Sequence, residues 1–227
     1  MTDRVDLIID FPSKIGSMLL DDKIDVGLVP VVVIPEMQEY HIISDYCIGC
    51  DGEVASVCLF SAVPLNKIEK VLLDYQSRTS VELLKILIEQ YWNIHPVFEI
   101  TSGNYQSEIS GTTAALIIGD RALEQRKISP YIYDLGQAWK NFSGLSFVFA
   151  AWISNKKLDE DFIKSFNRAN LFGLNQIEQV VNENPYSTFN LKDYYTKYIG
   201  YHLDDNKQKG LDLFLKKLSP AYSHATY

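Results

Sequence analysis

The sequence predicts an α/β protein, because short apolar runs alternate with segments of helical periodicity. The run Val71-Leu72-Leu73 is typical of a buried strand, and Val81, Leu84 and Ile88 follow it at helical spacing. A strand, a polar turn and a helix therefore follow one another in residues 71–91. A second unit, strand, helix and strand, is predicted at the start of the chain, and such units favour parallel strands.

The unit at the start of the chain begins with a predicted strand over Val5 to Ile9. Pro12 suits the entry of a helix that carries Ile15, Met18 and Leu19 on one face. Asp25 to Pro30 is predicted as the next strand, which would lie parallel to the first.

The rest of the chain continues the alternation. Apolar patterns predict strands over residues 53–61, 97–100, 114–120 and 145–152, a helix over 131–142, and helices in the remainder. Asn190 with Asp193 is a cap-like pair that opens one of these last helices. Aromatic residues recur at helical spacing there, and such stripes are typical of a core rather than of a cofactor site.

The polar turn Gln76 to Ser80 is a candidate anion site. Thr79 and Glu82 have the spacing of a capping box, which predicts Thr79 as the N-cap and a helix that begins at Ser80. The first backbone N–H groups, the hydroxyls of Ser77 and Ser80 and the guanidinium of Arg78 would then face a carboxylate or phosphate. The alternative is a well-capped helix with a surface arginine.

Asp120 is a second candidate site residue. It directly follows the apolar run 114–119, and a polar residue at the carboxyl end of a buried parallel strand lies where open α/β folds bind ligands. The alternative is that Asp120 caps the helix that follows it.

Composition excludes several classes of partner. The formal net charge of −8 and the pI of about 5.0 argue against nucleic acid or an anionic membrane, which both select clustered Lys and Arg. No apolar run is long enough to span a membrane, and MTDRVDLIID lacks the pattern of a signal peptide. We therefore expect a cytoplasmic protein with reduced cysteines.

No motif indicates a metal or a cofactor. Cys47 and Cys50 have redox spacing, but no second pair or nearby histidine supports zinc, so two incidental cysteines are the favoured interpretation. The four histidines are scattered without ligand spacing, and glycine-rich phosphate loops and serine-hydrolase motifs are absent. The sequence favours a cofactor-free enzyme or a small-molecule binding protein.

Several segments together resemble the chorismate dehydratases of the futalosine route to menaquinone. They are DVGLVPV at residues 25–31, SDYCIG and DGEVASVCLFS within 44–61, LDYQSRTSVELLKIL at 73–87, AALIIGDRAL at 114–123 and YDLGQAWKNFSGLSFVFAAW at 133–152. Their order and spacing agree with that family from about residue 5 to about residue 199.

The resemblance implies a two-lobed fold of the type 2 periplasmic-binding-protein kind, with a ligand cleft between the lobes. Residues 1–61 with 147–227 would form lobe 1, and residues 62–146 lobe 2. It implies loss of water from chorismate to give 3-(1-carboxyvinyloxy)benzoate, without a cofactor. Ser77, Arg78, Thr79 and Ser80 would bind a substrate carboxylate, with Ser56 and Asp120 on the cleft walls; no catalytic residue is assigned.

One departure concerns the front of the chain. Family members open with an additional strand and an SYLNT-like loop that brings an asparagine to the active site, and nothing here matches it. We expect the missing strand to leave residues 5–9 and 25–29 with unpaired backbone groups, or to force these two strands to pair directly and repack the helices above them. Met1 would then be an internal methionine of a longer protein, or the chain a degraded copy with weak or no activity.

Two other functions are compatible with the same resemblance. The dihydroxynaphthoate synthase of the same pathway shares the fold, although the SRTS, IIGDRAL and DLG segments are more similar to the dehydratase. The third possibility is a small-carboxylate binding protein without chemistry, because this fold serves receptors as readily as enzymes.

Overall fold

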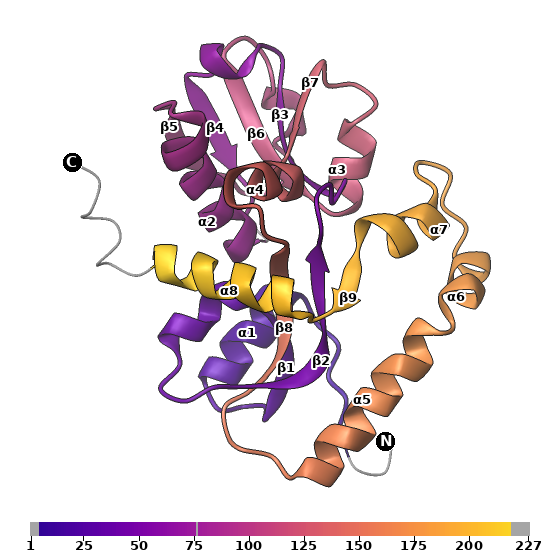
Figure 1. The fold of residues 1–227 in the computed structure, drawn as a ribbon. Coiled ribbons are helices and arrows are strands. Elements are labelled where there is room, and N and C mark those ends of the chain that lie inside the picture. The colour runs from indigo at the N-terminus through magenta and orange to yellow at the C-terminus, as the bar shows by residue number, and fades with distance from the viewer. Residues whose placement is uncertain (1–4, 76, 219–227) are drawn as a thin grey trace.

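Two β-sheets organise the chain in the computed structural model, which describes residues 5–75 and 77–218. The first has four strands, antiparallel to their neighbours, in the order β1 (Val26–Pro30), β8 (Phe147–Ser154), β2 (His41–Cys50) and β9 (Gly200–His202). The second has five, in the order β5 (Val97–Ile100), β4 (Lys70–Leu73), β6 (Thr113–Ile118), β3 (Val57–Ser61) and β7 (Tyr131–Asp134). Each sheet forms the centre of one lobe (Figure 1).

Helices cover both sheets and extend to one side. They are α1 (Pro12–Leu20), α2 (Arg78–Leu87), α3 (Asp120–Gln125), α4 (Leu135–Ser143), α5 (Glu160–Leu174), α6 (Ile177–Glu183), α7 (Leu191–Asp193) and α8 (Asp205–Leu218). Short helical turns are η1 (Val31–Glu36), η2 (Leu65–Lys67), η3 (Ile88–Trp92), η4 (Gln106–Glu108) and η5 (Tyr194–Tyr198). The segment α5 to α7 forms an arm that runs from the four-stranded sheet toward α3 (Figure 1).

The predicted α/β class is confirmed, but the predicted parallel unit at the start is wrong. Residues 5–9 form no strand, and β1 lies antiparallel to β8. In the described residues, β1 has β8 as its one strand neighbour, and the apolar segment before α1 does not pair with the open edge of β1. Leu7 and Ile9 are therefore 79% and 86% exposed.

Two further element predictions need correction. Residues 131–142 are not one helix, because β7 pairs with β3 up to Asp134, whose side chain then caps α4 by accepting from the Gln137 N–H. The strand predicted over 53–61 covers Val57–Ser61 alone, since residues 51–56 carry the chain from one sheet to the other. The cap at Asn190 is confirmed, with its Oδ1 accepting from the Asp193 N–H at 3.0 Å.

The position of β3 in the five-stranded sheet places the first lobe boundary before Val57, and not after Ser61 as predicted. β3 lies between β6 and β7 in the five-stranded sheet, so residues 57–61 belong with the second lobe. β8 begins at Phe147 in the four-stranded sheet, and residues 144–146 are therefore the second passage between the sheets. The remainder of the predicted division stays a prediction, and Gln76, residues 1–4 and residues 219–227 lie outside the described residues.

An aromatic cluster joins the two lobes. Trp139 of α4 is fully buried, and its ring lies edge-on to Phe147 of β8 at 5.3 Å and to Phe214 of α8 at 6.2 Å between centroids. Its indole N–H lies 3.3 Å from the Ser146 carbonyl oxygen. The same core continues into both sheets, through Val29 of β1 and Leu59 of β3. The lobes thus share one hydrophobic core next to the second passage.

Replacing Trp139 by Ala should destabilise the whole protein rather than one lobe. The expected loss is about 3–5 kcal/mol, because the substitution leaves a cavity between α4, β8 and α8. Urea unfolding followed by circular dichroism measures it. A stable variant, or one in which a single lobe unfolds early, would contradict a shared core. Trp152→Ala, which removes an aromatic side chain on the arm side of β8, is the variant for comparison.

Candidate functional site

The site is built at one edge of the five-stranded sheet. β4 and β6 are parallel neighbours, so Asp74 and Gly119, which follow them, lie at the same edge. β3 runs in the opposite direction, and its first residue Val57 pairs with Ile118, which brings Ser56 to this edge too. The Gly119 N–H donates to the Ser56 carbonyl oxygen at 2.8 Å. This is the carboxyl edge of the parallel strands, where α/β folds bind their ligands.

Helix α2 starts at this edge, but not with the predicted cap. Ser77 is the N-cap, with its Oγ 3.4 Å from the Ser80 N and its hydroxyl donating to the Ser80 Oγ at 2.7 Å. Thr79 lies inside the first turn, and Glu82 pairs with Lys85 instead of reaching back to a cap. The helix therefore begins at Arg78, and the predicted capping box is wrong.

Thr79 contacts the other lobe instead. Its Oγ1 lies 3.5 Å from the backbone N of Val32 in η1, and its side chain is buried, as is that of Ser80. Arg78 forms an ion pair with Glu36 at the end of η1, with both side chains nearly half exposed. The first turn of α2 is thus tied to η1 by a long hydrogen bond and an ion pair. An exposed ion pair contributes about 0–1 kcal/mol, so a competing carboxylate can displace Glu36.

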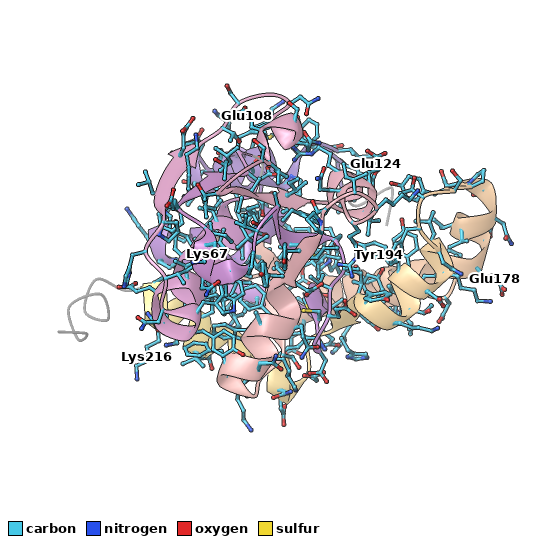
Figure 2. The ribbon with its side chains drawn as sticks, turned by 90° about the horizontal axis from the view of Figure 1, so that it is seen from above. Lys67, Glu108, Glu124, Glu178, Tyr194 and Lys216 are labelled. Atoms are coloured by element: carbon cyan, nitrogen blue, oxygen red, sulfur yellow. The ribbon has the colours of Figure 1, made fainter. Side chains whose placement is uncertain are left out.

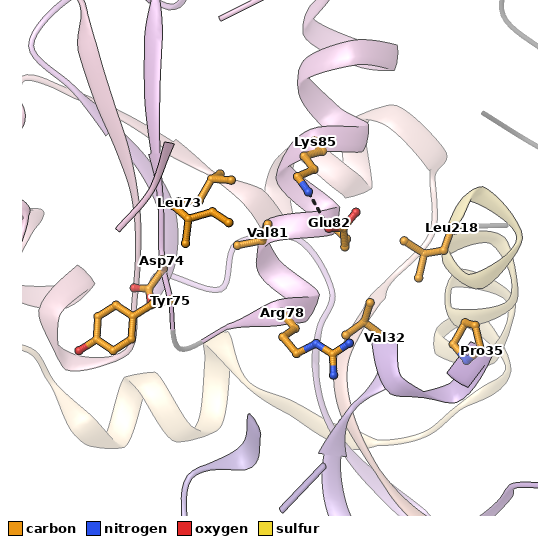
Figure 3. A pocket seen from close by; sticks show the side chains of 11 residues that line it. Val32, Pro35, Leu73, Asp74, Tyr75, Arg78, Val81, Glu82, Lys85 and Leu218 are labelled. Atoms are coloured by element: carbon orange, nitrogen blue, oxygen red, sulfur yellow. Dashed lines mark hydrogen bonds and ion pairs between the residues drawn. The ribbon is translucent and has the colours of Figure 1, made fainter. Parts of the chain in front are cut away.

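A pocket of about 460 Å³ opens beside this contact. Figure 3 shows the Arg78 guanidinium directed toward Val32, with the Glu82–Lys85 pair one turn further along α2. Of the six predicted site residues, Arg78 alone lines it. The lining residues are Val32, Pro35, Leu73, Asp74, Tyr75, Arg78, Val81, Glu82, Lys85, Ile100 and Leu218. The polar end is formed by the β4–α2 connection, and the apolar end by η1 and α8.

Ser56 and Asp120 form a second group at the same sheet edge. Ser56 is buried, and its Oγ lies 2.8 Å from the hydroxyl of Tyr194 in η5. Asp120 is the exposed first residue of α3, preceded by Gly119 in a left-handed conformation (φ 65°). Figure 2 places Tyr194 where the arm meets the rest of the molecule. Burial raises the pKa of Tyr194, and the Asp120 charge adds to this, so its hydroxyl stays protonated at neutral pH.

Tyr194 has no local sequence signal, because it reaches Ser56 across 138 positions.

A third group of side chains, which the sequence analysis missed, is centred on Asp74. Its carboxylate is fully buried and accepts from the Tyr105 hydroxyl and from Arg121 Nη2, both at 2.7 Å. The guanidinium of Arg121 lies 5.6 Å from the ring centroid of Tyr75. Asp74 could have been found by the rule that selected Asp120, since it directly follows a buried strand.

None of the three cysteines lines the pocket, although the Cys58 Sγ lies 3.4 Å from the carbonyl oxygen of Ala55, next to Ser56. Cys47, Cys50 and Cys58 are all buried free thiols, and burial raises the pKa of Cys47 to about 12. Within residues 5–75 and 77–218, His, Cys, Asp and Glu side chains form no group of three that could hold a metal ion. The helices in that part of the chain are each too short or too polar to span a bilayer.

The two lobes define a class of fold, and comparisons with known proteins show which structures share that fold and which family the chain belongs to. The chain is similar in fold to protein AF1704 from Archaeoglobus fulgidus, with a TM-score of 0.70, 13% identity and coverage of 92% of this chain and 83% of the other. It is also similar to an ABC transporter protein from Parabacteroides distasonis, with a TM-score of 0.61, 12% identity and coverage of 95% and 82%. The fold is the two-lobed, periplasmic-binding-protein-like one.

The family follows from the sequence comparison. Residues 2–220 match the family described as menaquinone biosynthesis, and the chain belongs to that family. A relative named chorismate dehydratase, from Thermus thermophilus, is 24% identical over 243 residues. The alignment covers 95% of this chain and 88% of that relative.

The buried thiols should be unreactive in the folded protein. With a Cys47 pKa of about 12, almost no thiolate exists at pH 8, and burial excludes the reagent from all three sulfurs. We expect reaction with a thiol-specific disulfide reagent to be at least about 100-fold slower than in the urea-unfolded chain, where three thiols should react. Fast reaction of one or two thiols in the native state would instead support a redox role for the Cys47–Cys50 pair.

Proposed function

We propose that this protein is a chorismate dehydratase, which removes water from chorismate to form 3-(1-carboxyvinyloxy)benzoate. Membership of the menaquinone biosynthesis family and the relative from Thermus thermophilus support this choice. The observation that carries it is the start of α2, where Arg78 lines a pocket of about 460 Å³ between the two lobes. A dianionic ring of this size needs such a site.

The reaction makes limited chemical demands on the protein. A ring C–H bond breaks and its proton passes to a base, the ring C–OH bond breaks as hydroxide leaves, and the proton and hydroxide together make water. The ring becomes aromatic, so the main tasks are to bind both carboxylates, orient the ring and assist the leaving group. One substrate carboxylate can serve as the base, which requires no catalytic histidine.

The residues at the sheet edge divide these tasks. The first turn of α2 and Arg78 bind one carboxylate, which displaces Glu36 from its exposed ion pair. Ser56 and Asp120 line the neighbouring wall of the cleft, and the protonated hydroxyl of Tyr194 lies within 2.8 Å of Ser56. These hydroxyls provide hydrogen-bond donors for a leaving hydroxide.

Incubation of the purified chain with chorismate tests the proposal directly. Formation of 3-(1-carboxyvinyloxy)benzoate, identified by chromatography and ultraviolet absorbance, is the expected result. Chorismate binding without turnover would contradict the dehydratase activity and favour a carboxylate-binding protein. Neither binding nor turnover would contradict the substrate itself.

Arg78→Gln should weaken chorismate binding, and Glu36→Gln is its matched control. Both variants remove the same ion pair, but Arg78→Gln also removes the cation that binds the carboxylate. A charge-assisted hydrogen bond contributes about 1.5–3 kcal/mol, so Kd measured by calorimetry should rise roughly 10- to 100-fold in Arg78→Gln. In Glu36→Gln it should stay the same or fall, because the competing carboxylate is gone. Equal effects in the two variants would mean that Arg78 serves the lobe contact alone.

A further inference from the structure

A buried carboxylate holds the passage between the lobes immediately before Ser56. Asp134 Oδ2 accepts from the Ala55 N–H at 2.8 Å, and Oδ1 accepts from the Val54 N–H at 3.1 Å. Oδ1 also accepts from the Gln137 N–H at 3.1 Å, which caps α4. The Asp134 side chain is only 7% exposed. One carboxylate thus joins the end of β7, the start of α4 and the passage.

Arg126 holds the same passage from the other side. Its Nη1 donates to the Ala55 carbonyl oxygen at 3.2 Å, and its Nη2 pairs with Glu53 at 3.0 Å. The Asp134 carboxylate lies 3.8 Å from Nη1. Asp134 therefore binds the N–H of Ala55 while Arg126 binds its C=O, so both peptide groups of this residue are fixed to the second lobe.

The backbone at Ala55 needs such support. Its φ is 62°, in the left-handed region that residues with a Cβ rarely adopt and that persists where the surroundings enforce it. The Ser56 N–H then donates to the Val54 carbonyl oxygen at 2.7 Å, and the Ser56 hydroxyl reaches Tyr194. The conformation of Ala55 thus decides where the Ser56 hydroxyl lies.

Close packing shows that the passage and α4 are fitted to each other. A Cβ placed at Gly136, in the first turn of α4, would lie 2.4 Å from the Gly52 carbonyl oxygen. Ordinary helix capping accounts for one of the four contacts of Asp134 with backbone N–H groups, the one to Gln137. Asp159, which caps α5 by accepting from Phe162 N–H at 2.7 Å, is an exposed aspartate with that single role.

We propose that Asp134 and Arg126 are positioning residues that hold Ala55 in its left-handed conformation and thereby place the Ser56 hydroxyl at the ligand site. The ligand part of this inference rests on the proposed function, since it takes Ser56 as a residue that contacts chorismate. The conformational part does not, because it concerns backbone hydrogen bonds present without a ligand. The burial that raises the pKa of Asp134 is the cost of keeping this carboxylate inside the protein.

Asp134→Asn tests the clamp with almost no change of shape. An amide has one acceptor oxygen, so it can keep the contacts of Oδ1 or those of Oδ2, but its NH₂ group then faces an N–H donor. Asp159→Asn is the control for loss of a capping carboxylate without contact to the passage. Backbone amide hydrogen exchange, measured by NMR, reports on Ala55 without any ligand, and chorismate calorimetry on the same samples reports on the site.

In Asp134→Asn we expect exchange at Ala55 and Ser56 to accelerate at least about tenfold, as a lost buried hydrogen bond implies, with unchanged exchange in the strand β6. Asp159→Asn should leave both amides at the rate of the parent. Chorismate affinity should fall in Asp134→Asn and not in Asp159→Asn. Unchanged exchange at Ala55 and Ser56 in Asp134→Asn would overturn the clamp, whatever the ligand result. If exchange accelerates while the parent itself binds no chorismate, the clamp stands and the proposed function fails.

Ala55→Gly provides an independent test of the conformational argument. Glycine adopts a positive φ without strain, so it needs less support from Asp134. In Asp134→Asn/Ala55→Gly we expect chorismate affinity to recover at least half of the fold-loss seen in Asp134→Asn. Ala55→Gly alone should bind as the parent does. An additive or larger loss in the double variant would show that Asp134 does not act through the conformation of Ala55.

Discussion

The chain must pass twice between two sheets, and the hydrogen bonds at these passages determine how the lobes sit. Backbone groups there belong to no sheet, so side chains have to satisfy them. The two passages are also joined to each other, because the Ser146 hydroxyl donates to Asp51 Oδ1 at 2.9 Å and Lys140 pairs with the same carboxylate at 2.6 Å. Trp139 packs next to the second passage, with its indole N–H 3.3 Å from the Ser146 carbonyl oxygen. The relative position of the lobes is therefore set by a small polar cluster above a shared aromatic core.

The parallel pairing of β4 with β6 places candidate ligand-binding residues at this junction. It brings the residues after both strands to the edge that faces the other lobe, together with Ser56 before β3. Two ion pairs at this edge differ in what they can do. Asp74 is fully buried with Arg121 and Tyr105, and breaking such a pair costs about 3–5 kcal/mol, so it stays closed. Arg78 and Glu36 are half exposed and contribute little, so a ligand carboxylate can exchange with Glu36.

Local pattern predicted the elements whose structure depends on local chemistry. The strand and helix of residues 71–87, the strand β5 and the cap at Asn190 follow from periodicity and side chains within a few positions. The local pattern does not decide which residue caps α2, because both Ser77 and Thr79 are suitable cap residues. In the structure Thr79 contacts Val32 and Glu82 pairs with Lys85, which leaves Ser77 as the cap. Tertiary partners decide the remaining cases. Residues 5–9 have the pattern of a strand but pair with neither sheet, and the contacts of Asp74 and Tyr194 span 31 and 138 positions.

The central claim is that the start of α2 binds a carboxylate between the lobes, and a crystal structure with 3-(1-carboxyvinyloxy)benzoate bound tests it most directly. We expect one product carboxylate to lie against Arg78 and the first backbone N–H groups of α2, with Glu36 displaced and the ring in the adjoining pocket. A product molecule bound elsewhere, or one bound while Arg78 still pairs with Glu36, would contradict this assignment.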